Sequence, residues 1–273
     1  MMVDPRVNEN ERRRWNGPYW PSVWPKREQL TRAVTPLLLD RLGLKTGQRV
    51  LDIGCGAGIS SIAAARAVGQ HGQVVGADIS APLVEYATRR AKEEGAGPVH
   101  FVVADVQQER IDGAPFEVAT SQFGVMFFDD PVAAFSNIRS QLVPGGRLGF
   151  ACWQEADRNP WSARAALSAF VAAPPPPAPG RWAPGPFAFA SPELVSSVLI
   201  GAGWGDIDHT AYEVTVTVTE DALTDDDQLR FLGVDPARMD EAGRAVEAHL
   251  APLRRHDGRY DAPLAFRIFT ALA

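Results

Sequence analysis

VLDIGCGAG, residues 50–58, is the stretch that decides the fold of this 273-residue chain. An apolar run typical of a buried β-strand leads into three glycines at alternate positions, Gly54, Gly56 and Gly58, and a helical pattern follows. Bare backbone of this kind allows tight turns and the close approach of a ligand. The stretch is therefore either a tight strand-to-helix connection or a loop that lies against a nucleotide, and the flanking sequence distinguishes the two.

The composition argues against several classes of protein. The net charge is −6, and apart from the run ERRR at residues 11–14 the basic residues are spread along the chain, so a nucleic-acid partner is not expected. The two cysteines, Cys55 and Cys152, are too few for a disulfide framework or a cysteine metal site, and we expect both to be small buried residues. No other cluster has the spacing of metal ligands, so no metal is expected.

The sequence also bears on where the protein is found. Its first residues carry charges but no apolar signal region, and no window is long and apolar enough to cross a membrane. We therefore expect a cytoplasmic protein without a membrane span.

Apolar runs recur roughly every 25 residues and alternate with helical patterns, which is the rhythm of β-α units in a parallel sheet. This rhythm predicts an α/β fold, a Rossmann-like, mostly parallel sheet of seven strands with helices on both faces. The predicted strands cover residues 49–53, 73–78, 99–104, 116–121, 147–152, 206–218 and 263–272, and the predicted helices cover 58–69, 81–94, 131–142 and 191–203.

Three segments lie outside this rhythm. An amphipathic pattern over residues 27–44 predicts a helix with a kink or a restart at Thr35, because Pro36 interrupts the hydrogen-bond ladder. Ahead of it, an arm rich in tryptophan and proline cannot form one regular helix; we favour a lid over the site for its aromatic side chains, with plain core packing as the alternative. Residues 153–190 are interpreted as an insertion that contains a stiff proline run at 174–177. The expected division is an arm and helix at 1–45, a core at 46–152, the insertion at 153–190 and the completion of the sheet at 191–273.

Polar side chains gather at the carboxyl ends of the predicted strands, where ligands bind in open parallel sheets. Asp78 ends the second strand, Asp105 the third, and Ser121 and Gln122 the fourth. If the strand order is 3-2-1-4, these ends lie side by side, about 4.8 Å apart. Carboxylates there suit a ribose and an adenine amino group, and the glycine backbone lets a chain pass close to the sheet. The row fits an adenosine with a polar tail.

The glycine loop itself argues against a dinucleotide or a nucleoside triphosphate. The fingerprint G-x-G-x-x-G fails in both registers, because Ile59 or Ser61 stands where the third glycine belongs, and no P-loop motif is present. Asp52 precedes the first glycine by two residues, where a carboxylate would repel a pyrophosphate but suit a tail that carries an ammonium group. Alternatively, Asp52 is a structural group that bonds to local backbone.

At this point the sequence resembles a known family, the class I S-adenosylmethionine-dependent methyltransferases. The resemblance extends over about residues 30–152 in the order and spacing of the family, and it is closest to small-molecule methyltransferases of the ubiquinone-biosynthesis-like group. The segment 159–204 looks like an insertion common among them. The motifs that carry the resemblance are VLDIGCGAG (50–58), VVGADIS (74–80), FVVADVQ (101–107), FEVATSQFGVMFFDDP (116–131) and LVPGGRL (142–148).

The resemblance implies a sheet whose last strand is antiparallel, S-adenosylmethionine as the cofactor and S-adenosylhomocysteine as its product. It implies that Asp78 binds the ribose, Asp105 lies near the adenine and the glycine loop lies beside the methionine part, with Ser121 and Gln122 near the sulfonium. The expected cofactor-binding residues are Asp52, Gly54, Cys55, Gly56, Gly58, Asp78, Ile79, Asp105, Val106, Ser121 and Gln122.

Methyl transfer from a sulfonium is an in-line displacement, in which orientation can supply about 7–11 kcal/mol of the barrier, so a general base is optional. His209 is the only histidine whose predicted position could approach the site, and we favour a structural role for it. Aromatic side chains around the sheet edge predict an apolar or aromatic acceptor, although each of them could be a core residue instead. The expected pocket residues are Tyr19, Trp20, Phe123, Met126, Trp153, Trp161, Phe187 and Phe189.

These expectations converge on a methyltransferase that acts on a small, largely apolar metabolite, with O-methylation ahead of C- or N-methylation. One alternative keeps the cofactor in a structural role, or uses its charge to promote cyclisation or elimination. A second alternative, a Rossmann-type nucleotide-binding module, is disfavoured by the failed phosphate fingerprint. The expected partner is a small molecule, and a homodimer is left open.

Overall fold

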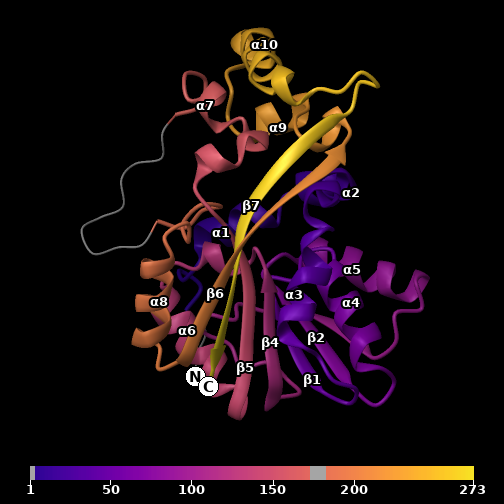
Figure 1. Ribbon diagram of the computed structural model, residues 1–273, viewed down its shortest axis with the longest axis vertical. Coiled ribbons are helices and arrows are strands. Elements are labelled where there is room, and N and C mark those ends of the chain that lie inside the picture. The colour runs from indigo at the N-terminus through magenta and orange to yellow at the C-terminus, as the bar shows by residue number, and fades with distance from the viewer. Residues whose placement is uncertain (1–3, 173–182) are drawn as a thin grey trace.

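The computed structural model describes residues 4–172 and 183–273 (Figure 1). One seven-stranded sheet runs through the molecule in the order β3-β2-β1-β4-β5-β7-β6, which confirms the predicted order of the first four strands. β7 is antiparallel to both of its neighbours, and the other pairs are parallel, as the family resemblance implied. The strands are β1 (Arg49–Ile53), β2 (Gln73–Asp78), β3 (Val99–Val103), β4 (Phe116–Gln122), β5 (Leu142–Trp153), β6 (Gly205–Val218) and β7 (Tyr260–Leu272).

Helices pack around this sheet and on its ends. α4 packs on β1 and β2, α5 packs on β2 and β3, α3 packs on β5, and α6 packs on α8. The α-helices are α1 (Glu9–Trp15), α2 (Tyr19–Thr31), α3 (Val34–Leu42), α4 (Ile59–Val68), α5 (Ala81–Glu93), α6 (Pro131–Ser140), α7 (Arg164–Leu167), α8 (Pro192–Gly201), α9 (Asp226–Phe231) and α10 (Met239–Leu250).

The predicted helices of the core begin where the sequence provides caps. The Ser80 hydroxyl accepts a hydrogen bond from the backbone N–H of Leu83, and the Asp130 carboxylate accepts one from Ala133. A proline follows each cap at the first or second helical position, where its missing N–H costs nothing. These local signals fix the starts of α5 and α6.

The N-terminal helices differ from the prediction. The break lies at residues 32–33, between α2 and α3, and not at Thr35. The reason is steric, because the ring of Pro36 clashes with the carbonyl four residues earlier, on Arg32, and so ends the ladder there. The arm is interrupted as expected, between α1 and α2, but α2 continues through Pro25.

Two long strands carry a cap above the sheet. β7 pairs with β5 only from Phe266 to Leu272, whereas its pairing with β6 continues to Tyr260. The β6-β7 ribbon therefore extends beyond the carboxyl edge of the parallel strands, and α7, α9 and α10 pack together at its far end (Figure 1). Residues 191–273 thus complete the sheet and also form part of a cap. The predicted proline connector at residues 174–177 lies outside the described residues.

The close approach of two backbones makes Gly54 a sensitive position. Its φ is +64°, and a Cβ there would lie 2.8 Å from the Cα of Gly124. We expect Gly54→Ala to lower the free energy of unfolding by about 3 kcal/mol, from a strained φ and a backbone clash. Gly47→Ala is the matched control, because Gly47 also has a positive φ (+87°) but a Cβ there would have no neighbour within 4 Å. Its expected loss is about 1–2 kcal/mol. Urea denaturation measures both, and equal losses would contradict the packing argument.

Candidate active site at the carboxyl edge of the sheet

The glycine loop after β1 folds around the end of β2. The backbone N–H of Gly56 donates to Asp78 Oδ2 at 2.8 Å, and the N–H of Ser80 donates to Asp78 Oδ1 at 2.9 Å. Burial raises the pKa of Asp78, and these backbone donors act in the opposite direction. Each carboxylate oxygen keeps a free lone pair. Asp78 can therefore accept hydrogen bonds from two neighbouring hydroxyl groups.

Asp105 lies one strand further along and is bound to the arm. Its Oδ1 accepts from Asn8 Nδ2 at 2.8 Å, and its Oδ2 lies 3.4 Å from Arg12 Nη2. Asn8 Nδ2 thereby takes a position that an amino group of a ligand could take. The neighbouring Val106 is buried, and its carbonyl accepts from Asn137.

Asp52 is completely buried beneath the loop. Its Oδ2 accepts hydrogen bonds from the hydroxyls of Ser60 and Ser61, each at 2.6 Å, in the first turn of α4. Burial raises the pKa of Asp52 to about 6, against the opposing effect of these two bonds. The local contacts of Asp52 are therefore with side chains of α4, and its role toward a cofactor stays a prediction.

The N-terminal arm covers the loop. A Cβ on Gly56 would lie 2.6 Å from the indole ring of Trp24, so this ring rests on the loop backbone. The carbonyl of Trp15 accepts from the Ser80 hydroxyl at 2.7 Å, and Asn16 Nδ2 donates to the carbonyl of Ile79 at 3.1 Å. Sequence reasoning identified the aromatic arm but not Asn8, Arg12 or Asn16, since their partners are distant in the sequence and no local pattern indicates them.

At the end of β4, the side chain of Ser121 bonds to the neighbouring backbone and that of Gln122 bonds to the N-terminal helices. The Ser121 hydroxyl donates to the carbonyl of Ile53 and accepts from the N–H of Gly124. The Gln122 side chain accepts from Thr35 and donates to the carbonyl of Thr31, at the junction of α2 and α3. Both side chains thus hold the site in shape, and their predicted place near a sulfonium stays a prediction.

Neither cysteine is suited to nucleophilic chemistry. Cys55 and Cys152 are both buried, and burial raises the pKa of each thiol. A thiol with a raised pKa holds little thiolate at neutral pH. Both behave as the small buried residues that we expected.

The predicted pocket residues lie in several different surroundings. Phe123 stacks on Trp153 with ring centroids 3.9 Å apart, and Trp161 follows at 4.9 Å from Trp153. On the arm, Tyr19 stacks on Phe231 of α9 at 4.5 Å. Phe123 and Trp153 are themselves buried in the core cluster, and Met126 and Phe189 are wholly buried in it. Trp20 packs against Trp15 at 4.2 Å, and the half-buried Phe187 lies beneath Arg164.

His209 does not approach the site. It lies exposed on the edge strand β6 and contacts Phe269. Three strand spacings separate it from β4, which is about 14 Å in a sheet. The structure therefore gives no support to a catalytic role for His209.

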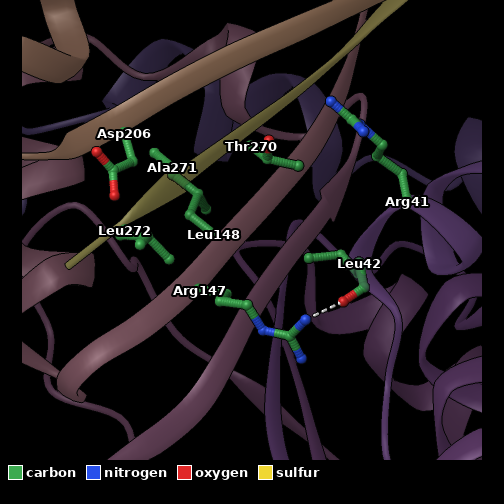
Figure 2. A pocket seen from close by; sticks show the side chains of 8 residues that line it. All are labelled: Arg41, Leu42, Arg147, Leu148, Asp206, Thr270, Ala271 and Leu272. Atoms are coloured by element: carbon green, nitrogen blue, oxygen red, sulfur yellow. Dashed lines mark hydrogen bonds between the residues drawn. The ribbon is translucent and has the colours of Figure 1, made fainter.

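A separate pocket opens at the other end of the sheet (Figure 2). It is lined by the ends of α3, β5 and β7, and the Arg147 guanidinium donates to the carbonyl of Leu42 across it. Arg41 at its rim pairs with Asp208. Because this pocket lies at the amino end of β5, it is not part of the site formed by the glycine loop.

Unpartnered polar atoms mark the carboxyl edge. Within residues 4–172 and 183–273, four buried side-chain atoms have no hydrogen-bond partner: Arg14 Nε, Trp24 Nε1, Asp52 Oδ1 and Thr120 Oγ1. Asp52 and Thr120 are paired residues near the ends of β1 and β4, and the other two atoms belong to the arm. Buried atoms without partners are uncommon in folded proteins. Together with the loop glycines and Asp78, they fit a polar ligand at this edge.

Comparison with known proteins agrees with this geometry. A family model described as a methyltransferase domain matches residues 50–146, from β1 into β5. Aklanonic acid methyltransferase DauC of Streptomyces sp. (strain C5) is 36% identical over 105 residues, which cover 38% of this chain and 48% of that protein. Residues 50–146 thus match a methyltransferase domain, in agreement with the resemblance of the motifs to class I S-adenosylmethionine-dependent methyltransferases.

Other relatives of the chain are named for transfer to oxygen and to carbon. Nocamycin O-methyltransferase of Saccharothrix syringae is 35% identical over 43% of this chain and 42% of its own length. A ubiquinone/menaquinone biosynthesis C-methyltransferase, UbiE of Cellvibrio japonicus (strain Ueda107), is 36% identical over 40% of this chain and 45% of its own length. The chain thus spans about half the length of the curated relatives it matches.

The solved structures extend the likeness to the whole sheet. The YcgJ protein of Bacillus subtilis superposes with a TM-score of 0.59 at 15% identity, over 88% of this chain and 97% of that one. This likeness concerns the fold alone. In the part of the chain that the structure describes, no helix is long and apolar enough to cross a membrane.

The raised pKa of Asp52 predicts a pH-dependent stability. A carboxyl whose pKa rises on folding stabilises the protein fully below its unfolded pKa, 3.8, and loses that contribution as pH rises through about 6. Relative to Asp52→Asn, we therefore expect the wild-type free energy of unfolding to fall by about 2 kcal/mol between pH 4 and pH 7. Urea denaturation across this range measures the difference. A constant difference between the two proteins would show that Asp52 titrates normally.

Proposed function

We propose that this protein transfers a methyl group from S-adenosylmethionine to an oxygen atom of a small, largely apolar or aromatic acceptor. The observation that carries the proposal is the placement of two aromatic groups on the same edge as the glycine loop. Phe123 directly follows β4 and stacks on Trp153, while Tyr19 of the arm stacks on Phe231 of the cap. A site walled by aromatic rings favours an apolar, planar acceptor.

Different groups at the carboxyl edge bind different parts of the cofactor. Asp78 accepts hydrogen bonds from the ribose hydroxyls, and the glycine loop lets the methionine part lie against the backbone. Bound S-adenosylmethionine supplies an electrophilic methyl group. The protein contributes orientation and the exclusion of water, for which buried indole rings are well suited. His209 is remote, so the proposal includes no general base from the histidine that the sequence suggested.

The arm acts as the lid in this proposal. Trp24 rests on Gly56, and Asn8 and Arg12 contact Asp105, so the arm covers the surface that the cofactor needs. The Glu28 carboxylate of α2 binds the guanidinium of Arg90 on α5 through two hydrogen bonds, of 2.6 and 3.0 Å. This pair keeps the later part of α2 attached to the core, and the lid opens by displacing the residues that precede Glu28, Trp24 among them.

The names of the relatives are consistent with transfer to oxygen. One relative is named as an O-methyltransferase for nocamycin, and another as a methyltransferase for aklanonic acid. A UbiE-type C-methyltransferase also matches over the core, so the core itself does not choose the acceptor atom. In this proposal the arm, the insertion and the cap determine which atom of the acceptor is methylated.

Transfer of label tests the proposal directly. The protein is incubated with methyl-labelled S-adenosylmethionine and pools of small aromatic alcohols, phenols and acids, and the products are separated and counted. We expect label in a product whose methyl group sits on oxygen. Label that stays in the cofactor with every pool, although the cofactor binds, would contradict a transferase function.

A matched pair of variants ties the transfer to the site. Asp78→Asn removes the charge that two hydroxyls would share, so we expect kcat/KM for the cofactor to fall at least about 30-fold. Asp112→Asn is the control, because Asp112 is exposed in the loop after β3. It should change the rate less than twofold. Equal rates for the two variants would refute the role of Asp78.

A further inference from the structure

Arg14 is a cation that the fold places among aromatic rings. Its guanidinium carbon lies 5.7 Å from the ring centroid of Trp15, 5.8 Å from that of Phe127 and 5.9 Å from that of Phe231. These rings come from three separate parts of the protein: the arm, the turn η1 (Val125–Phe127) after β4, and α9 of the cap. Arg14 therefore lies where the lid, the core and the cap meet.

The guanidinium is poorly neutralised there. Within the described ranges, Arg14 Nε is buried without a hydrogen-bond partner, and the only ion pair of Arg14 joins Nη1 to Glu11 Oε1 across 4.0 Å. Glu11 is itself occupied, since its Oε2 accepts from Trp15 Nε1 at 2.8 Å. Burial raises the pKa of Glu11, which weakens it further as a counter-charge. A third of the Arg14 side chain, 34%, remains accessible.

Neighbouring arginines show that this state is not general in the arm. On the same helix Arg13 pairs with Glu9 at 2.6 Å and is largely exposed. Arg12 contacts Asp105, and Arg27 donates to two carbonyls and to Gln228. Arg14 differs from them in combining partial burial, aromatic neighbours and unused donors.

We propose that Arg14 binds a carboxylate of the acceptor, which makes the acceptor an aromatic carboxylic acid. The planar fork of a guanidinium matches the two oxygens of a carboxylate, and such charge-assisted bonds are strong where water is scarce. The ring of the acid packs on Phe127 and Phe231, and its carboxylate supplies the partner that Arg14 lacks. The inference rests on the proposed function and narrows its substrate class.

A binding comparison without cofactor tests the inference independently of catalysis. Calorimetry compares 2-naphthoate with 2-naphthamide, which has the same shape and no charge. We expect the wild-type protein to bind the carboxylate at least about tenfold more tightly. Arg14→Met should reduce this preference to less than twofold, and Arg14→Lys should retain part of it. Arg13→Met is the matched control and should keep the full preference.

Each of the following outcomes would overturn the inference. One is equal affinity for the acid and the amide, or no saturable binding of either. Another is an equal loss of preference in Arg13→Met and Arg14→Met. A further outcome concerns the other source of a carboxylate, the methionine part of the cofactor. If Arg14→Met weakens the binding of S-adenosylhomocysteine but not of 5′-methylthioadenosine, which lacks that carboxylate, then Arg14 binds the cofactor and not the acceptor. Failure of label transfer in the previous experiment would refute the proposed function and leave this binding comparison unchanged.

Discussion

The contact between the N–H of Gly56 and the carboxylate of Asp78 is the constraint on which the site depends. It joins the loop after β1 to the end of β2 at 2.8 Å, and the two glycines on either side allow the tight course of the loop. A carboxylate so buried is costly unless it is hydrogen-bonded. The same bonds that stabilise Asp78 hold it in place for two hydroxyl groups. Fold and binding capacity therefore come from one interaction.

Segments outside the parallel core supply the aromatic side chains to which we assign acceptor recognition in the proposed function. The arm contributes Trp15, Trp24 and Arg14, and the cap contributes Phe231, at the end of a ribbon formed by β6 and β7. The arm is held by polar contacts at several points, among them the pair of Glu28 and Arg90. Such contacts can be broken and reformed at lower cost than apolar packing in a core.

The sequence predicted the core far better than the surroundings of the site. The ends of β1 and β2 and the first residues of α5 and α6 were predicted correctly, because alternation, glycine spacing and helical periodicity are local signals. Long-range contacts have no such signal: the contact between Asn8 and Asp105 joins residues 97 positions apart. The same reasoning listed Phe189 among the pocket residues, whereas it is buried in the core. The sequence alone does not distinguish an aromatic residue of a pocket wall from one of the core. Arg14 belongs to the run ERRR, for which the sequence indicated no role, and only the fold surrounds it with rings.

The most direct test of the central claim, that the glycine loop and Asp78 form an S-adenosylmethionine site, is calorimetry on the intact protein. S-adenosylhomocysteine and NAD are titrated separately, since both carry an adenosine and only NAD carries a pyrophosphate. We expect saturable binding of one S-adenosylhomocysteine per chain and no saturable binding of NAD. Saturable binding of NAD without binding of S-adenosylhomocysteine would contradict this claim.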